Sequence, residues 1–541
     1  MPLKPLAALL ISAALALAGC ADLPKNVERP VSTALPSPAG TPLGELVDAQ
    51  RAAAGGRHAS GFVLLSGPQA AYGSRLALVD AAQKTLDLQY YAIHADASSQ
   101  RLLRAVAAAA RRGVRVRVLL DDFHSAGRDA LVMRLAFVPN VEMRMFNPIA
   151  GARGSAIGRM LGALGDFARV QQRMHNKLFI ADNALGVTGG RNLGDAYFGQ
   201  ADAGNFVDLD VLAAGPVVQD LSRSFDSYWN NERAYPVQSL VTREELDALR
   251  QGFEAADAAQ HHPEDHTAAS QPPQEQAQAD RRARVWDQQP MDLAQARLTW
   301  APAAVLADRP AKIPPPTEPA DAGSDAADAH ADTVVDGLLQ LMGQAQRDLL
   351  IVSPYFVPGP DMKQAFAAAR ARGVRVRVLT NSLASNDAPI AHAGYARHRP
   401  ELLALGVELY EMRSELPSRV NGLGATGSTG SSRAMLHSKL IVMDGRLLAV
   451  GSMNLDMRSQ HQNTELALLI RSGALSRQAA AQIDDALRDA AWRVEADGDG
   501  RLVWRAPQAS GLPDATTEPD ASLPLRLMLQ LLGPLAPDHL L

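Results

Sequence analysis

Two stretches of this 541-residue chain are copies of each other. The first runs from His175 to Asn192 and the second from His437 to Asn454, and both follow the pattern H-x-K-x4-D-x6-G-[GS]-x-N. Every matched position is offset by 262 residues. In each copy a polar His-x-Lys pair interrupts an apolar run that is typical of a β-strand. This repetition predicts that two halves of the chain share one fold.

The sequence around the copies repeats as well. Residues 85–91 alternate as a strand does, residues 100–112 form an Ala- and Leu-rich helical pattern, and residues 114–120 again indicate a strand. The same succession recurs at 348–353, 362–372 and 374–379, and the string GVRVRVL begins at both Gly113 and Gly373. A β-α-β unit implies parallel strands. We therefore expect two tandem α/β domains, each a mixed sheet flanked by helices, related by a pseudo-twofold axis with one active site at their interface.

The N-terminus has the layout of a secretory signal. An Ala- and Leu-rich run follows Lys4 and ends at Leu17-Ala18-Gly19-Cys20, and Cys20 is the only cysteine of the chain. A disulfide within the chain and a cysteine-based zinc site are thereby excluded. Two interpretations of this ending stay open: Cys20 has a role of its own, or the segment is a plain secretory signal that happens to end in Cys.

Composition shifts divide the rest of the chain. A hydrophobic content of 47% and a charged content of 21% are those of a globular protein, and 541 residues suffice for two or three domains. Pro-, Ala- and Ser-rich segments read as a tether or as linkers. The expected division is signal peptide 1–20, tether 21–54, first domain 55–250, linker 251–332 with a short return to the first domain near 298–306, second domain 333–495 and C-terminal extension 496–541. An apolar helical pattern within that extension is expected to pack on the body, although contact with lipid is the alternative.

The repeated residues suit metal-free transfer of a phosphoryl-type group. Side chains two apart on a strand share a face, so His175 lies beside Lys177 and His437 beside Lys439. A protonated lysine cannot ligate a metal, and His-x-Lys offers too few ligands for zinc. One imidazole can attack phosphorus while the other protonates the leaving oxygen. We expect no cofactor and no metal.

The other motif positions receive supporting roles. The lysines, with Asn192 and Asn454, are expected to hold the non-bridging oxygens of the phosphoryl group. Asp182 and Asp444 are each seven residues after their histidine, so an unbroken strand would turn them to the opposite face. They are predicted to be structural. The remaining motif positions, which we also expect to be structural, are Gly189, Gly190, Gly451 and Ser452.

Acidic residues follow both motifs at matched places. Residues 206–211 and 463–468 both look like strands, and Glu465 aligns best with Asp208. A carboxylate on an imidazole N–H would fix the tautomer and raise the basicity of the ring. Asp210 lies on the same strand face as Asp208 and is a rival for this role.

At these residues the chain resembles the phospholipase D superfamily, whose signature is a pair of H-x-K-x4-D motifs. Further strings make it most similar to bacterial cardiolipin synthases of the C type, over roughly residues 62–470. The L-A-G-C ending resembles the lipobox of bacterial lipoproteins, in which the cysteine is lipidated. The strings that carry the synthase resemblance are Gln89-Tyr90-Tyr91 with Asp96, Ser353-Pro354-Tyr355-Phe356-Val357-Pro358, residues 391–396, Leu409-Tyr410-Glu411 and residues 454–459.

The resemblance implies transfer of a phosphatidyl group between phospholipids through a phosphohistidine, with His175 as nucleophile and His437 as general acid and then base. The implied substrates are phosphatidylglycerol and, as a second candidate, phosphatidylethanolamine. The implied location is a membrane-anchored lipoprotein facing the periplasm of a Gram-negative-type bacterium. Gly190 departs from the superfamily pattern, which usually has Ser, and this removes a hydroxyl donor from the first half only.

Two other classes of function stay open at this point. One is a hydrolase of the same superfamily, either a phospholipase D or a nuclease; the net charge of −5 argues against a nucleic-acid partner. The other is a non-catalytic surface lipoprotein on a duplicated α/β scaffold. Intact His and Lys residues in both copies disfavour it.

Overall fold

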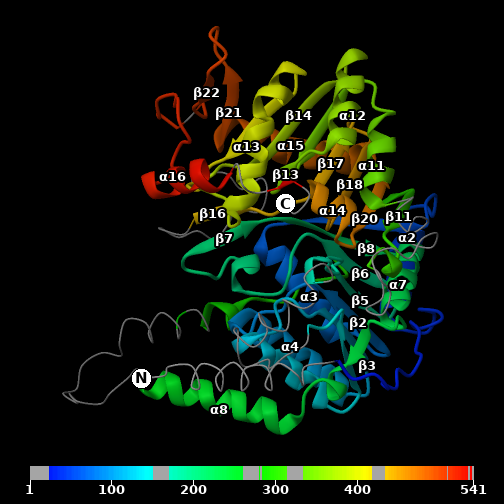
Figure 1. The fold of residues 1–541 in the computed structure, drawn as a ribbon. Helices are drawn as coiled ribbons and strands as arrows, with labels where there is room; N and C mark the ends of the chain where they lie inside the picture. Colours follow the sequence, from blue (N-terminus) through cyan, green and yellow to red (C-terminus); the bar gives the residue numbers. More distant parts are fainter. Residues whose placement is uncertain are drawn as a thin grey trace, which may run out of the picture.

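The computed structural model describes residues 23–149, 170–259, 280, 283–313, 333–416, 433–508, 510–533 and 537–538. Two α/β halves stack on each other, the first from blue to green in Figure 1 and the second from green to red. Each half contains one nine-stranded mixed sheet. The expected fold class, two tandem domains of one kind, is confirmed.

The first sheet has the order β10-β1-β8-β6-β5-β2-β3-β4-β9. Its strands β2, β3 and β4 run parallel, and α4 (Ala97–Arg111) connects the first two of them as the β-α-β pattern predicts. Helix α4 ends at Arg111, two residues before the left-handed Gly113, whose φ of 98° disfavours any residue with a side chain. The strands are β1 (Ser60–Ser66), β2 (Thr85–Tyr90), β3 (Arg115–Asp121), β4 (Val141–Phe146), β5 (Leu178–Ala181), β6 (Leu185–Gly189), β8 (Leu209–Ala214), β9 (Ala234–Pro236) and β10 (Thr299–Ala301).

The second sheet repeats this arrangement in the order β11-β20-β18-β17-β12-β14-β15-β21-β22. The matched strands β5 and β17 differ by the same 262 residues as the sequence copies. Strands β12, β14 and β15 are parallel, like their counterparts in the first sheet. The strands are β11 (Ala303–Ala307), β12 (Asp348–Val352), β14 (Arg375–Asn381), β15 (Glu408–Met412), β17 (Leu440–Met443), β18 (Leu447–Gly451), β20 (Leu466–Arg471), β21 (Ala491–Ala496) and β22 (Leu502–Arg505).

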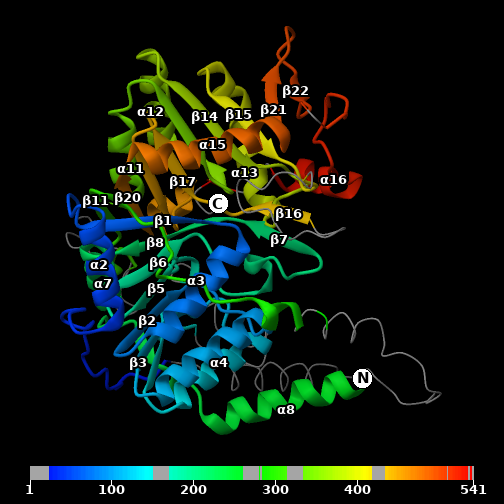
Figure 2. The ribbon, with the colours of Figure 1, turned by 180° about the vertical axis from the view of Figure 1, so that it is seen from behind.

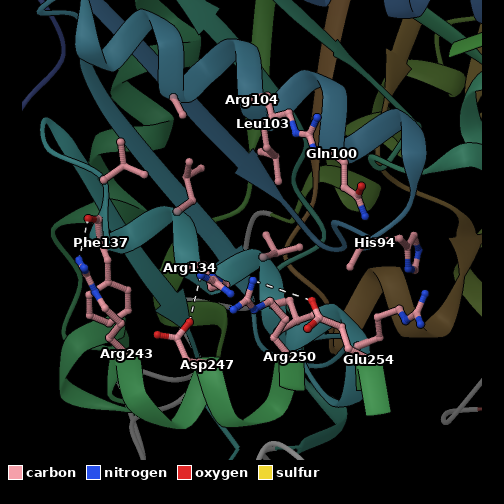
Figure 3. A pocket seen from close by; sticks show the side chains of 17 residues that line it. His94, Gln100, Leu103, Arg104, Arg134, Phe137, Arg243, Asp247, Arg250 and Glu254 are labelled. Carbon is pink, nitrogen blue, oxygen red and sulfur yellow. Dashed lines mark hydrogen bonds and ion pairs between the residues drawn. The ribbon is translucent and has the colours of Figure 1, made fainter. Parts of the chain in front are cut away.

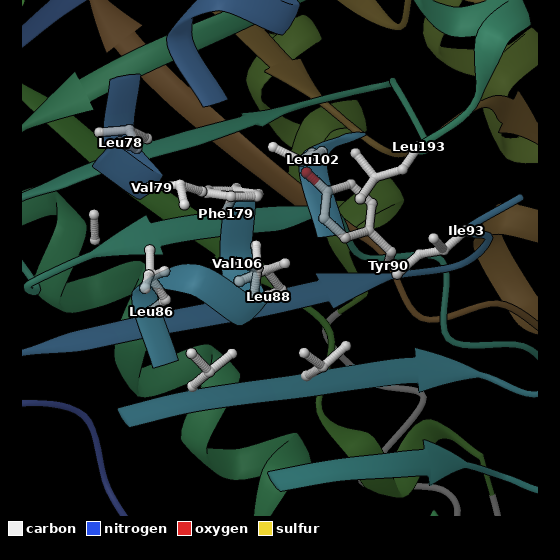
Figure 4. Close-up of a cluster of buried hydrophobic side chains, with 14 of the residues drawn as sticks. Leu78, Val79, Leu86, Leu88, Tyr90, Ile93, Leu102, Val106, Phe179 and Leu193 are labelled. Atoms are coloured by element: carbon white, nitrogen blue, oxygen red, sulfur yellow. The ribbon is translucent and has the colours of Figure 1, made fainter. Parts of the chain in front are cut away.

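Helices cover both faces of each sheet, and this creates three apolar layers. Figure 4 shows the layer between the first sheet and the helices α3 (Pro68–Ala81) and α4, where Leu86 and Leu88 of β2 meet Leu78, Val79 and Val106. The matching outer layer of the second half packs under α11 (Val334–Met342), α12 (Pro360–Ala371) and α13 (Pro389–Ala404). The middle layer contains side chains of both halves, together with α7 (Pro216–Trp229) and α15 (Gly473–Asp489). The two halves therefore share a continuous core.

Elements outside the two large sheets and their covering helices complete the described fold. Two small parallel sheets join distant segments, and one of them, β7 with β16, crosses between the halves (Figure 1). The view from behind in Figure 2 shows α8 along the outer edge of the first half. The remaining elements are β7 (Gly204–Val207), β13 (Phe356–Val357), β16 (Arg433–Leu436), β19 (Leu455–Asp456), α2 (Pro42–Ala53), α8 (Arg243–Ala259), α14 (Met457–His461), α16 (Leu523–Leu532), and the 3₁₀ helices η1 (Gly127–Phe137), η2 (Asp195–Phe198), η3 (Val237–Ser239) and η4 (Pro310–Lys312).

The expected tether is wrong for the described residues 23–54, because this segment lies on the first domain. Helix α2 buries Leu43 and Val47 in the first core layer. Before it, the extended chain is held through its backbone: Ala34 N–H donates to Asp226 at 2.9 Å, and Arg117 donates to the carbonyl of Ser32 at 2.9 Å. The absence of a hydrophobic period misled the prediction, since residues 30–34 are held mainly through their backbone groups.

The expected return of residues 298–306 to the first domain is half right. Strand β10 pairs with β1 and extends the first sheet, as predicted. The next strand, β11, instead pairs with β20 and opens the second sheet. The chain therefore passes from one half to the other at Pro302, and the second half begins well before the predicted residue 333.

The second domain also extends beyond the predicted boundary at residue 495. Strand β22 pairs with β21 and closes the second sheet. Helix α16 then packs on the body through Leu525 and Leu529, as expected. Its other face leaves Leu523, Leu527 and Leu531 exposed. Among the described residues, none of the helices combines the length and apolar character that crossing a bilayer requires.

Candidate active site

The two His-x-Lys motifs meet where the halves join, and each lies just before a strand instead of inside one. His175 and Lys177 precede β5, and His437 and Lys439 lie between β16 and β17. The other half holds each motif through its backbone. His175 N–H donates to Thr464 O at 2.9 Å, and His437 N–H donates to Val207 O at 2.9 Å. The condition set for the motif aspartates, an unbroken strand from histidine to aspartate, is therefore not met.

Each histidine is paired with a carboxylate of the opposite half. The Nδ1 atom of His175 lies 3.0 Å from Glu465, and Nδ1 of His437 lies 2.8 Å from Asp208. Thr464 and Val207, which bind the motif backbones, directly precede these two acids. The same pairing of segments thus places both the ring and its carboxylate. With Nδ1 engaged, Nε2 is the nitrogen left for chemistry in each ring.

Both motif lysines are buried, and each donates to the carbonyl of its own histidine. The Nζ–O distances are 2.6 Å for Lys177 and 2.7 Å for Lys439. Burial, opposed by Glu465 and assisted by the neighbouring Lys439, lowers the pKa of Lys177 to about 7. Burial likewise lowers the pKa of Lys439 to about 8. Two ammonium groups without a bound anion are costly in such a pocket. The site is therefore built to receive negative charge.

Burial favours the neutral form of both imidazoles near pH 7. Burial lowers the pKa of His175 to about 4, with Lys177 adding to the effect and Glu465 opposing it. Burial and the two lysines hold the pKa of His437 well below its ordinary value. A phosphodiester anion would raise both values by Coulomb attraction. Binding of an anion therefore favours proton uptake by the pair.

The two orienting carboxylates differ in their surroundings. Burial alone would raise the pKa of Glu465, but His175, Lys177 and Ser452 outweigh it and keep the pKa low. Two hydroxyls donate to Glu465: that of Ser452 at 2.5 Å and that of Ser459 at 2.8 Å. Burial raises the pKa of Asp208. The halves are thus chemically unequal around otherwise equivalent histidines.

Gly190 differs from Ser452 for a steric reason. A Cβ at Gly190 would lie 2.6 Å from the Asp208 carboxylate and 2.9 Å from the carbonyl of His437. The space that a serine would need is therefore occupied by the Asp208–His437 pair. In the neighbouring motif positions, a Cβ at Gly189 would meet Asp210, and a Cβ at Gly451 would meet the backbone at Leu466.

The motif aspartates lie at the far ends of their strands, away from the histidines. The Asp182 carboxylate accepts the backbone N–H groups of Gln83, Lys84 and Thr85 at 2.7–2.9 Å. Asp444 accepts those of residues 346–348. Each occupies a left-handed turn, with φ of 50° and 54°. The structure places them in supporting positions, although a turn does this and not the strand alternation that we expected.

The motif asparagines occupy different settings. The side-chain oxygen of Asn192 accepts from Ala92 N–H at 3.2 Å, and its amide nitrogen donates to the Tyr197 hydroxyl at 2.9 Å. Asn454 is buried, and its Oδ1 has no hydrogen-bond partner among the described residues. Such a group at a site is what a bound ligand would satisfy. Asn454 is therefore better placed than Asn192 to contact a ligand.

Asp210 is not an alternative partner for a histidine. Its carboxylate lies 2.9 Å from Arg75 and 3.5 Å from Arg191, and all three side chains are buried. Arg191 also donates to the carbonyls of Tyr197 and Asp208. In the sequence, Arg191 is only a variable position of the first motif copy; the structure shows that it holds the backbone at Asp208.

Aromatic side chains surround the histidines, and sequence reasoning assigned them no role. The ring of Tyr91 contacts His175 at a centroid distance of 5.1 Å. Tyr197 and Phe206 contact His437 at 5.3 and 4.9 Å. The sequence offered one signal: Tyr91 belongs to the string Gln89-Tyr90-Tyr91, and Phe206 begins the strand-like segment 206–211. We call these three residues the aromatic collar.

Within the described part of the chain, His, Cys, Asp and Glu side chains form no group of three or more suited to a metal ion. Cys20 and the predicted signal peptide lie outside the described residues.

Comparisons with known proteins agree on one family. The model for "Cardiolipin synthase, PLD-like domain" matches residues 76–229 and 338–487. The chain is 36% identical to cardiolipin synthase C of Escherichia coli over 87% of this chain and 94% of that protein. It is 25% identical to a cardiolipin synthase of Geobacillus kaustophilus over 75% of this chain and 62% of that protein.

One solved structure supports the two-domain architecture. The phosphatidylserine synthase of Haemophilus influenzae covers 91% of this chain and 100% of its own, with a TM-score of 0.52 at 14% identity, a likeness that concerns the fold alone. The sequence matches over both halves are far stronger. The chain belongs to the cardiolipin synthase family of PLD-like proteins and is an enzyme of the phospholipase D superfamily.

Proposed function

We propose that the chain is a phosphatidyltransferase that moves a phosphatidyl group from one phospholipid to the hydroxyl of another, with phosphatidylglycerol as acceptor. Phosphatidylglycerol or phosphatidylethanolamine is the donor. The observation that carries the proposal is the crossed pairing of His175 with Glu465 and of His437 with Asp208, around two buried lysines. The 36% identical relative bears the name cardiolipin synthase C, in agreement with this substrate class.

The reaction proceeds in two displacements. Nε2 of His175 attacks the phosphorus, the bond to the head-group oxygen breaks, and His437 gives that oxygen its proton. The acceptor hydroxyl then loses its proton to His437 and attacks the phosphorus, and the P–N bond breaks. Lys177 and Lys439 stabilise the negative charge on the non-bridging oxygens in both steps.

This chemistry is metal-independent in the proposal, because the donor set does not fit a cation. Ammonium groups cannot ligate, and the imidazole Nδ1 atoms already pair with the two carboxylates. The lysines supply the positive charge that a metal ion would otherwise bring to a phosphoryl transfer.

The activity test uses purified protein in vesicles of phosphatidylglycerol, with and without phosphatidylethanolamine. Cardiolipin and the released head group are the expected products, and His175→Ala should abolish both. Phosphatidic acid as the sole phosphatidyl product would favour the hydrolase instead. Unchanged activity in His175→Ala would contradict the mechanism.

A second experiment separates the roles of the two histidines. Burial lowers the pKa of both histidines, so the order of roles follows the superfamily resemblance and not the charge distribution. A phosphatidyl ester of p-nitrophenol needs no protonation of its leaving group. We expect His437→Ala to release p-nitrophenol in a single burst and to accumulate an alkali-stable phosphohistidine, whereas His175→Ala gives no burst. The reverse result would exchange the roles.

The proposed location is the periplasmic face of a membrane, with the chain anchored through a lipidated Cys20. The support is the L-A-G-C sequence at the only cysteine and a substrate that resides in a bilayer. Labelled palmitate should enter the wild-type chain and not Cys20→Ser. Labelling of Cys20→Ser would contradict the anchor.

A further inference from the structure

A groove with an apolar floor and a basic rim lies in the first half of the chain. It has a volume of about 840 Å³ and runs between α4, η1 and α8 (Figure 3). This volume falls within the ~300–1,000 Å³ range of ligand sites. Its floor is formed by Leu103, Ala107, Leu131, Val132, Leu135 and Val138.

The rim of the groove is strongly basic in a chain whose net charge is −5. Five arginines line it against two carboxylates, Asp247 and Glu254. Asp247 pairs with Arg134 at 3.0 Å, and Glu254 lies 3.8 Å from Arg250. Arg104 lies over the ring of Trp286 at 5.5 Å. An apolar floor beneath an excess of guanidinium groups is complementary to an anionic amphiphile.

One end of the groove is connected with the catalytic pair through ring contacts. His94 lies at that end, with Gln100 and Arg104 nearby (Figure 3). The ring of His94 stacks on Tyr197 of the aromatic collar at 6.3 Å, and Tyr197 contacts His437 at 5.3 Å. Arg128 belongs to the same end, because its neighbour Asp129 bonds Nδ1 of His94 at 2.9 Å.

Transfer between two phospholipids requires places for two phosphate groups. The reacting phosphate binds to the buried lysines of the catalytic motifs. The acceptor carries a phosphate of its own, a few bonds from its attacking hydroxyl. A second cationic place is therefore needed on the side of His437, which takes the proton of that hydroxyl. The donor does not need this second cationic place, because its only phosphate is the reacting one.

We propose that this groove holds the acceptor phospholipid, its acyl chains on the apolar floor and its phosphate at Arg104 and Arg128. The inference rests on the proposed function and deepens it, since it assigns a site to the second substrate. Occupation of the groove presents the acceptor hydroxyl to the phosphohistidine and keeps water from competing. The arginines thereby favour transfer over hydrolysis.

The test compares two acceptors in the same vesicles, phosphatidylglycerol and ethanol, with phosphatidylethanolamine as donor. Ethanol has neither a phosphate nor acyl chains, so it does not use the groove. We expect Arg104→Glu and Arg128→Glu each to lower transfer to phosphatidylglycerol about tenfold, the size of one lost charge-assisted hydrogen bond. Transfer to ethanol should stay unchanged, and the share of phosphatidic acid should rise.

Arg488→Glu is the matched control, because Arg488 is a half-exposed arginine on α15 of the other half. Leu103→Trp, which narrows the apolar floor, should reproduce the arginine phenotype without a change of charge. Equal losses with both acceptors, or no loss with either, would overturn the acceptor site while leaving the transferase intact. A wild-type protein that makes only phosphatidic acid would overturn the proposed function itself, together with the acceptor site.

Discussion

Glu465 of the second half lies 3.0 Å from Nδ1 of His175 in the first, although 290 residues separate them. The reciprocal pair, Asp208 and His437, has the same arrangement at 2.8 Å. Neither half can therefore orient its own histidine. Duplication has produced one composite site from two incomplete ones, and separate halves should be inactive.

Asp208 and its neighbour Asp210 offer a comparison between a positioning and a stabilising carboxylate. Asp208→Asn replaces the charged carboxylate that fixes the His437 tautomer with a neutral amide, so kcat should fall about 10- to 100-fold with little change in melting temperature. Asp210→Asn breaks the buried pair with Arg75 and should cost about 3–5 kcal/mol of unfolding free energy. Steady-state kinetics and thermal denaturation on both variants check this.

Asp208→Glu should retain part of the kcat that Asp208→Asn loses, because glutamate keeps a charged carboxylate for the His437 ring. A fall in kcat of equal size in Asp208→Asn and Asp210→Asn, measured on folded protein, would contradict the assignment of a positioning role to Asp208 and a stabilising role to Asp210.

The core of each domain could be predicted from sequence because its signals are local. Alternation over 85–91 and the helical pattern over 100–112 specify β2 and α4 without knowledge of partners. The backbone contacts of residues 30–35 left no apolar pattern to read. The crossed carboxylates were equally hidden, since Glu465 and Asp208 could be aligned with each other but not assigned to a particular histidine. Pairing across an interface depends on tertiary geometry alone.

Restoring the usual superfamily serine at Gly190 should damage the enzyme. The Cβ of Gly190→Ser would lie 2.6 Å from Asp208, so the carboxylate must move off His437. We expect kcat to fall at least tenfold. Ser452→Gly, the mirror change, removes one hydroxyl from Glu465, which keeps a second from Ser459, and should cost less. Kinetics of both variants at matched stability provide the measurement. A more active Gly190→Ser enzyme would refute the steric account.

The two motif aspartates should affect stability and not chemistry. Asp182→Ala leaves three backbone N–H groups without their acceptor, at about 1–3 kcal/mol for each one that stays buried. Asp444 is more exposed, so Asp444→Ala should cost less. Denaturant unfolding measures the difference. A loss of kcat in folded Asp182→Ala would argue for a catalytic role instead.

The stability contribution of Asp444 should depend on pH. Burial would raise its pKa, but the N–H groups of residues 346–348 outweigh it and the pKa is lowered. A carboxylate with a depressed folded-state pKa stabilises fully above its unfolded value of about 3.9 and loses this effect as pH falls through the folded value. The deficit of Asp444→Asn in melting temperature should therefore be complete at neutral pH and should shrink below about pH 4. A deficit that stays constant with pH would contradict the charge-based explanation.

The buried lysines predict an unusually early alkaline limit of activity. Burial places the pKa of Lys177 at about 7 and that of Lys439 at about 8 in the free enzyme. Both lose their charge as pH rises through this range, and the attraction for an anionic phosphodiester then weakens. We expect kcat/KM, which reports the free enzyme, to fall above about pH 8 and not near 10.5.

The p-nitrophenyl substrate provides the profile between pH 6 and 10, since its phosphodiester charge is constant there. Lys177→Arg keeps a positive charge throughout this range, because a guanidinium does not deprotonate in proteins. The alkaline limb of this variant should move to higher pH even though its kcat falls. An alkaline limb at the same pH in wild type and Lys177→Arg would assign the limit to a group other than Lys177.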